Sequence, residues 1–279
     1  MKRTILIALS AIILTLLTVF VIIEVQAQKA QLRGDFIEEL HSEILDESRK
    51  LLIHLPKGYG QNTNKRYPIL VALDGTSHDH IVANAVHTLN YAQTLSDIII
   101  VGIPNTDRKR DLTPEYMHRD KASEAMGEGD RFLEFLEKEA IPFIEKKYRG
   151  NGYRMLSGHS RGGLFTMYAL MEKPILFKAY FCHSPAFWRE DNRIVKKMND
   201  RLKKSNSLKG FIYLSLGSQE NEKMKKGFNK MVALLEKNRP KELKVSSEYT
   251  EGGTHQTNPY YAVPHAFMLW QEQTKQILK

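Results

Sequence analysis

One short stretch combines a serine with the backbone freedom that a nucleophile needs. Residues 155–163 read MLSGHSRGG, so that Ser160 lies between Gly158 and Gly162 with one residue on either side. A serine on a sharp strand-to-helix turn has a strained backbone, and flanking glycines let the neighbouring chain pass close to it. The spacing predicts a nucleophile elbow that presents the Ser160 hydroxyl above the end of a strand.

A serine hydroxyl attacks a carbonyl only when a base accepts its proton and an acid orients that base. On sheets that carry such an elbow, the acid and then the histidine follow the serine along the chain, each on a loop after a strand. The loop after one expected strand supplies Glu220, with Glu222 as the alternative acid, and a later glycine-rich loop supplies His255. A serine-histidine dyad without an effective acid is the third possibility. The pattern predicts carboxylic ester hydrolysis through an acyl-enzyme.

Ester hydrolysis also needs N–H donors that face the developing oxyanion. The Arg161 amide directly follows the nucleophile, and we expect the second donor to be the Thr76 amide, in the loop after the strand expected over residues 67–73. His78 and His80 form a His-x-His pair nearby, but the sequence places no further metal ligand beside them. We therefore expect no metal and no cofactor.

Two other histidines lie at the ends of expected strands. His159 is inside the elbow and precedes the serine, so we expect it to pack beneath the turn. His183 follows another apolar run and is expected to approach the pocket.

Unbroken apolar runs alternate with segments of helical periodicity along the chain. Such runs are typical of parallel strands covered on both faces, and the alternation predicts one doubly wound α/β sheet. Two antiparallel strands are expected first, at 36–46 and 50–55, and the other strands at 67–73, 98–103, 153–156, 177–183, 210–216 and 243–249. The expected helices cover 82–95, 130–148, 162–171, 224–235 and 264–278. Residues 104–129 lack periodicity and form either a loop packed over the site or a mobile cap.

The first residues resemble a targeting segment. Lys2 and Arg3 precede an uncharged apolar run, and Val25 and Ala27 supply a small-residue cleavage site, so residues 1–27 are predicted to be a secretory signal. The alternative is an uncleaved anchor, because the run approaches the ~20 residues that span a bilayer. We expect residues 28–279 to form a single domain in the periplasm or outside the cell, with membrane association only if residues 1–27 are retained.

Composition narrows the partners. The formal net charge of +9 becomes +8 once two basic residues and one acidic residue of the leader are removed. This excess could attract anionic substrates, glycans or membrane surfaces, but its spread over Lys-rich helical faces favours an ordinary solvated surface. The lysines are spread over helical faces without interleaved aromatics, which argues against a nucleic-acid partner. Cys182 is the one cysteine, and its apolar surroundings predict a packed core thiol.

Several segments, taken together and in order, carry a family resemblance. They are SEIL at 42–45, LPKGY at 55–59, YPILVALDG at 67–75, VGIPN at 101–105, RDLTP at 110–114, FL at 132–133, IPFI at 141–144, GHSRGG at 158–163 and GTH at 253–255. The chain resembles the putative esterase family of α/β-hydrolases, which includes esterase D-like enzymes and bacterial siderophore esterases acting on enterobactin and related catecholate trilactones.

The resemblance implies an α/β-hydrolase fold with Ser160 as nucleophile, His255 as base and Glu220 as acid. It also implies that residues 108–114 border the substrate pocket, where Arg110 would meet an anionic group.

The segment SPAFWR at 184–189 departs from the family pattern. Siderophore esterases tend to carry a second aromatic after Trp188, where this chain has Arg189, so this side of the pocket would suit either a trianionic iron complex or a carboxylated or sugar ester. The Arg161 guanidinium is expected to be free to help select the substrate. The resemblance implies a siderophore trilactone as substrate, with a carbohydrate acyl or feruloyl ester, or binding without catalysis, as alternatives.

Overall fold

The computed structural model describes residues 13–15, 17–18, 34–204 and 207–274. The signal or anchor predicted over residues 1–27 lies almost entirely outside these ranges and stays a prediction. Within them, no helix is both long enough and apolar enough to cross a membrane.

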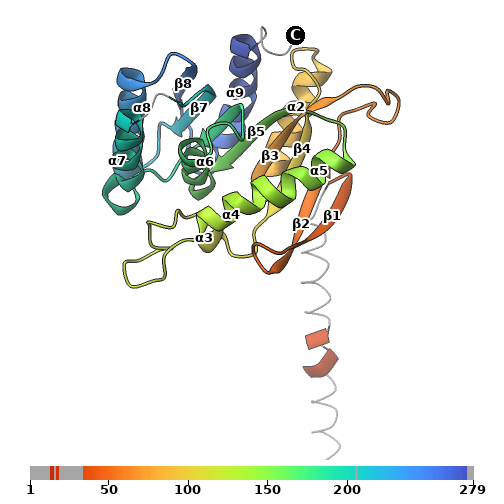
Figure 1. The fold of residues 1–279 in the computed structure, drawn as a ribbon, viewed down its shortest axis with the longest axis horizontal. Helices are drawn as coiled ribbons and strands as arrows, with labels where there is room; N and C mark the ends of the chain where they lie inside the picture. The colour runs from red at the N-terminus through yellow and green to blue at the C-terminus, as the bar shows by residue number, and fades with distance from the viewer. Residues whose placement is uncertain (1–12, 16, 19–33, 205–206, 275–279) are drawn as a thin grey trace, which may run out of the picture.

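A single sheet organises the described residues, and its strands run in the order β1-β2-β4-β3-β5-β6-β7-β8 (Figure 1). The β1 and β2 strands pair antiparallel, β2 is antiparallel to β4, and the remaining pairs are parallel. The strands are β1 (Phe36–Ser42), β2 (Glu47–His54), β3 (Tyr67–Gly75), β4 (Ile99–Pro104), β5 (Gly150–His159), β6 (Ala179–His183), β7 (Gly210–Gly217) and β8 (Leu243–Thr250). The predicted fold class, a mostly parallel α/β-hydrolase sheet with antiparallel N-terminal strands, is confirmed.

Helices cover both faces of the sheet, as the fully buried β3 and β6 strands require. One face carries α2 (His78–Tyr91) and α9 (Asn258–Thr274), whose apolar residues share a core with β3, β6 and β7. The other face carries α4 (Gly129–Phe135), η1 (Leu136–Ala140), α5 (Ile141–Lys147), α6 (Arg161–Glu172), α7 (Arg189–Lys204) and α8 (Glu222–Asn238).

The helices differ from the predicted ones in several places. The α2 helix, His78–Tyr91, starts and ends four residues earlier than the predicted helix over 82–95. The predicted helix over 130–148 is α4, η1 and α5 in succession, with a π-helical turn at η1. The α9 helix starts before its predicted first residue, so Pro264 lies in the helix interior rather than in its first turn. The α7 helix was not predicted, because its sixteen residues are mostly charged and only a narrow stripe of them is buried.

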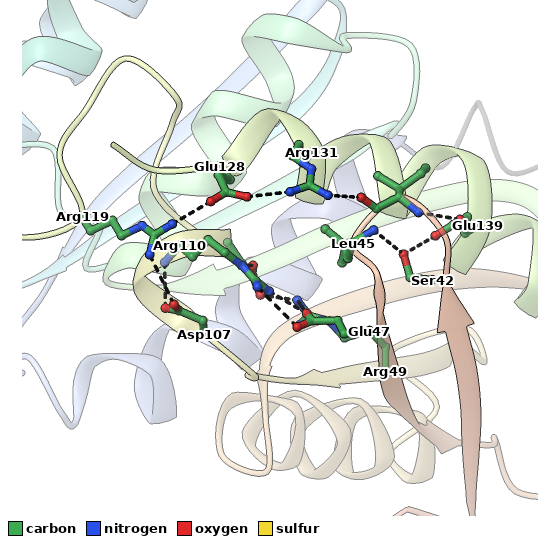
Figure 2. A network of polar contacts seen from close by, with 12 residues as sticks. Ser42, Leu45, Glu47, Arg49, Asp107, Arg110, Arg119, Glu128, Arg131 and Glu139 are labelled. Atoms are coloured by element: carbon green, nitrogen blue, oxygen red, sulfur yellow. Dashed lines mark hydrogen bonds and ion pairs between the residues drawn. The ribbon is translucent and has the colours of Figure 1, made fainter. Parts of the chain in front are cut away.

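Residues 104–129, which include the short helix α3 (Arg108–Asp111), form a packed loop rather than an open cap. The amide of Gly127 donates to the Met117 carbonyl at 2.8 Å, and that of Gly129 donates to the Thr113 carbonyl at 2.9 Å. A Cβ at Gly127 would lie 2.0 Å from the Thr113 oxygen, so only glycine fits there. Figure 2 shows side chains of this loop bonded to Glu47 at the start of β2 and to Arg131 of α4.

Candidate active site

The predicted elbow forms where β5 ends and α6 begins. Ser160 has φ 57° and ψ −112°, a strained conformation that is typical of functional residues held by their surroundings. Its amide donates to the His183 carbonyl at 2.9 Å, which ties the turn to β6. A Cβ at Gly158 would lie 2.4 Å from the Gly162 carbonyl group, so the tight turn requires glycine at 158.

The three residues predicted to cooperate lie in a hydrogen-bonded line. Glu220 Oε2 lies 2.9 Å from His255 Nδ1, and Ser160 Oγ lies 3.0 Å from His255 Nε2. Because a carboxylate only accepts hydrogen bonds, Nδ1–H donates to Glu220, and Nε2 is left to accept the serine proton. The arrangement has the geometry that general-base activation of a serine requires.

Glu220 is held as a carboxylate beneath the loop that carries it. Its Oε1 accepts hydrogen bonds from the Ser184 hydroxyl and from the Gly217 amide, at 2.5 and 3.0 Å. Burial raises the pKa of Glu220, but the hydrogen bonds from His255, Ser184 and Gly217 lower it, and the net pKa lies below its ordinary value. The alternative acid, Glu222, is exposed in the first turn of α8 and pairs with Lys225.

The two predicted oxyanion donors have different environments. Arg161 is the first residue of α6, so its amide belongs to the turn whose N–H groups find no acceptor within the helix. The Thr76 amide instead donates to Asp79 Oδ1 at 2.8 Å, because the Asp79 side chain in the first turn of α2 folds back over the loop after β3. The structure therefore does not support Thr76 as the second donor.

Arg110 does not face the serine. Its guanidinium binds Glu47 Oε1 at 2.6 Å and Asp111 Oδ1 at 2.7 Å, and Figure 2 shows it directed at the start of β2. Because these two carboxylates neutralise the Arg110 guanidinium, the structure does not support the expected contact with an anionic substrate.

The guanidinium groups of Arg161 and Arg189 hold the loop of residues 104–129. Arg161 donates to the Thr113 hydroxyl and the Arg119 carbonyl, and Arg189 donates to the His118 and Arg119 carbonyls at 3.1 Å each. Both side chains are more than nine-tenths buried. The expectation that Arg161 and Arg189 would face the substrate is not supported.

Trp188 remains available at the surface beside the elbow. Its side chain is 38% exposed, and the nearby Ala186 amide donates to the Ser160 carbonyl at 3.0 Å. The segment that carries this indole is thus fixed to the nucleophile's own backbone.

A cluster of three imidazoles lies beneath the site, with His78 and His183 buried and His159 half-buried. His159 Nε2 donates to the His255 carbonyl at 2.8 Å, and the two rings lie 4.6 Å apart. His78 lies 6.5 Å from the His159 ring and 5.4 Å from the His183 ring. Burial lowers the pKa of His78 to about 4 and that of His159 to about 3, and it also lowers the pKa of His183. These three rings are neutral near pH 7, and His159 fixes the loop that carries the base.

The match to known proteins agrees with this geometry. The family described as "Putative esterase" matches residues 42–279. The chain belongs to the esterase family.

Two curated relatives of this esterase-family chain carry substrate names. It is 32% identical over 149 residues to a siderophore enterobactin esterase of Emericella nidulans, a match that covers 46% of this chain and 49% of the relative. It is 29% identical over 196 residues to the ferri-bacillibactin esterase BesA of Bacillus subtilis, which covers 63% and 68%. The chain thus aligns with about half the length of the fungal relative.

The fold of the chain also resembles that of a solved serine hydrolase. The chain superimposes on an IroE-like serine hydrolase from Shewanella oneidensis with a TM-score of 0.78 and 29% identity, over 84% of this chain and 79% of that one. This similarity supports the α/β-hydrolase fold.

Sequence reasoning missed the ion pair that joins the loop after β3 to the elbow. Arg108 binds Asp74 through Nε and Nη2 and donates from Nη2 to the His159 carbonyl at 3.2 Å. Asp74 lies inside a segment that carries the family resemblance, and Arg108 lies just before another. An aspartate and an arginine at these positions do not by themselves indicate that the two side chains form an ion pair.

Proposed function

We propose that this esterase-family chain is a serine hydrolase that cleaves carboxylic esters through an acyl-enzyme. The observation that carries the proposal is the hydrogen-bonded line from Ser160 through His255 to the buried Glu220. Family membership supports a hydrolase that acts on ester bonds.

In the proposed reaction, Ser160 Oγ attacks the ester carbonyl while its proton moves to His255 Nε2. Glu220 stabilises the imidazolium through Nδ1–H, and the Arg161 amide donates to the carbonyl oxygen as that oxygen becomes negative. The C–O bond then breaks, and the imidazolium gives its proton to the leaving alkoxide. Water, deprotonated by His255, hydrolyses the acyl-serine and restores the hydroxyl.

For the substrate, we propose a siderophore trilactone of the enterobactin type. Two relatives are named as siderophore esterases. The formal charge of +8 on residues 28–279 suits a polyanionic iron complex, and Trp188 offers an aromatic surface beside the elbow. We propose a periplasmic or secreted location from the signal-like residues 1–27, with residues 28–279 as the catalytic domain.

The mechanism predicts that Ser160→Ala abolishes hydrolysis of a short p-nitrophenyl ester and leaves the fold intact. Initial rates should fall by about 10⁴-fold or more, because the nucleophile is lost while substrate binding remains. Circular dichroism and the melting temperature check the fold. Turnover that survives in Ser160→Ala would contradict the proposal.

A substrate panel separates the esters. Enterobactin, with and without iron, should be cleaved to shorter catechol-serine products, whereas acetylated and feruloylated xylan should not be cleaved. Preference for either xylan ester would assign the chain to carbohydrate esters. Tight binding of enterobactin without any product would indicate a non-catalytic binding protein.

A further inference from the structure

Two buried carboxylates, those of Asp74 and Asp79, flank the loop after β3. Different groups compensate their negative charges. Asp74 has a fixed cation, because Arg108 binds both of its oxygens. Asp79, whose side chain has no exposed surface, has ion-pair contacts only with His54 and His80 within the described part of the chain. Burying a carboxylate is costly unless a cation or several hydrogen bonds compensate it. Asp79 accepts hydrogen bonds from the Thr76 amide and from His54, but among the described residues it has no lysine or arginine partner, so a cation bound beside it would be stabilised.

The three side chains have the spacing of metal ligands. His54 Nε2 lies 3.0 Å from Asp79 Oδ2, and His80 Nδ1 lies 3.9 Å from the same oxygen. All three ligand atoms lie within 4.8 Å of one another. A tetrahedral zinc ion with ligands ~2.0–2.1 Å away separates neighbouring ligand atoms by roughly 3.3 Å. Small rotations of two partly exposed imidazoles, at 16% and 26% exposure, would complete that geometry.

The surrounding elements are built around the carboxylate. A Cβ at Gly102 on β4 would lie 2.6 Å from Asp79 Oδ2, so this glycine makes the space that the carboxylate occupies. The Thr76 amide binds Oδ1 and fixes the plane of the group, so that Oδ2 faces the two histidines. A hollow lined by His54, Lys57 and His87, among others, opens beside the His54 side of the cluster.

The pairing differs from the one that the sequence suggested. His78 and His80 do not act together, because His78 turns to the buried rings beneath the elbow and binds the Ser157 hydroxyl at 2.9 Å. The third ligand comes from His54 at the end of β2, twenty-six residues before His80 in the chain. Local sequence spacing did not reveal it.

We propose that His54, Asp79 and His80 bind one divalent transition-metal ion, with zinc as the class that two imidazoles and one carboxylate suit best. A water molecule would complete the tetrahedron. The site is separate from the esterase reaction and takes no part in its chemistry. The ion would join β2 to the start of α2. Through Asp79 it would also fix the Thr76 loop beside Ser160.

The test measures zinc binding to the full chain after treatment with a chelator. Isothermal titration should give one zinc per chain, and the same ion should raise the melting temperature, because a ligand that binds only the folded state stabilises it. His80→Asn should weaken binding by at least about tenfold. His87→Asn is the matched control, since His87 is an exposed histidine on the same helix and should leave binding unchanged.

Zinc binding to two further variants distinguishes the proposed site from other zinc sites. Zinc could bind the triad imidazole instead, so His255→Asn should retain the site, and loss of binding in that variant would overturn the proposal. Asp79→Asn keeps an oxygen for the Thr76 amide but removes the charge, and it should lose zinc while its far-UV circular dichroism is retained. The proposal fails if zinc does not bind at micromolar concentration, or if it binds His54→Asn and His80→Asn as it binds the parent chain. Magnesium, which prefers oxygen ligands, should not compete at equal concentration.

Discussion

At the scale of single residues, the environment of Glu220 decides which acid serves His255. Two glutamates lie two positions apart in one loop, but only Glu220 is buried and accepts hydrogen bonds from Ser184, Gly217 and His255. Glu222 begins α8, with its side chain in solvent. The difference follows from where the loop ends and the helix starts.

Glu220→Gln is therefore expected to lower kcat by roughly 10³–10⁴-fold, because an amide at this position no longer holds the histidine tautomer or stabilises the imidazolium. Glu222→Gln is the matched control and should retain nearly full activity. Steady-state kinetics with a p-nitrophenyl ester measure both. Equal losses in the two variants would argue that the acid assignment is incorrect.

The roles of residues were predictable where they depend on order and spacing. Ser160 and His255 could be found because glycines mark the elbow and a loop after a later strand carries the base. Thr76, Arg110 and Arg189 could not be placed, because the direction of an amide or a guanidinium depends on partners that only the fold brings near. For Thr76 that partner is the Asp79 carboxylate, and for Arg189 it is a set of loop carbonyls.

At the scale of elements, the loop of residues 104–129 is fixed to β2 by a buried ion pair. Arg49 and Asp111 are 1% and 2% exposed and lie 2.6 Å apart, and Arg110 binds the other oxygen of Asp111. The Arg49 guanidinium also stacks over Phe132, 5.4 Å from its centroid. This contact joins the second strand, the short α3 helix and α4.

Asp111→Ala should lower the free energy of unfolding by about 1–3 kcal/mol, because buried N–H donors of Arg49 lose their acceptor while Glu47 still pairs with the guanidinium. Urea denaturation followed by tryptophan fluorescence measures the change. Glu134→Ala, which breaks the exposed pair with Lys138, is the control and should change nothing measurable. A stability loss no greater than the control's would show that the ion pair is dispensable.

Elements with continuous apolar runs were predictable, and those defined by tertiary contacts were not. The parallel strands were found because burial on both faces leaves a long hydrophobic signature. The α7 helix was missed because only Ile194, Met198 and Leu202 mark its inner face strongly among many charges. The start of α9 was misplaced because Pro264 resembles a first-turn residue, whereas buried packing against the sheet extends the helix back to Asn258.

At the scale of the whole molecule, the three histidines beneath the active site couple stability to pH. His78, His159 and His183 have pKa values lowered by burial, so they stay neutral in the folded chain at pH values where the unfolded chain protonates them. The unfolded state then binds more protons, and stability decreases as pH falls below the ordinary histidine pKa of about 6.5. Their contribution is fully present above that pH.

We expect the free energy of unfolding to fall between about pH 6.5 and 5 by up to ~1.4 kcal/mol per pH unit for each of these histidines. Denaturant melts at half-unit pH steps measure the slope. In His159→Gln, the slope of the unfolding free energy against pH should be smaller by the contribution of one histidine. We expect this variant to be less stable than the parent chain at pH 7.5. A flat profile across this range in the parent chain would rule out the buried neutral imidazoles.

The thiol of the single cysteine, Cys182, can report how often the folded chain opens. Cys182 lies fully buried in β6 between two parallel neighbours, and burial raises the pKa of its thiol well above the ordinary value. With one thiol, the chain can form no internal crosslink, and its fold is indifferent to the redox state of the compartment. A thiol reagent can reach the Cys182 sulfur only after the centre of the sheet has opened. The rate of thiol labelling therefore reports the rate or the population of unfolding.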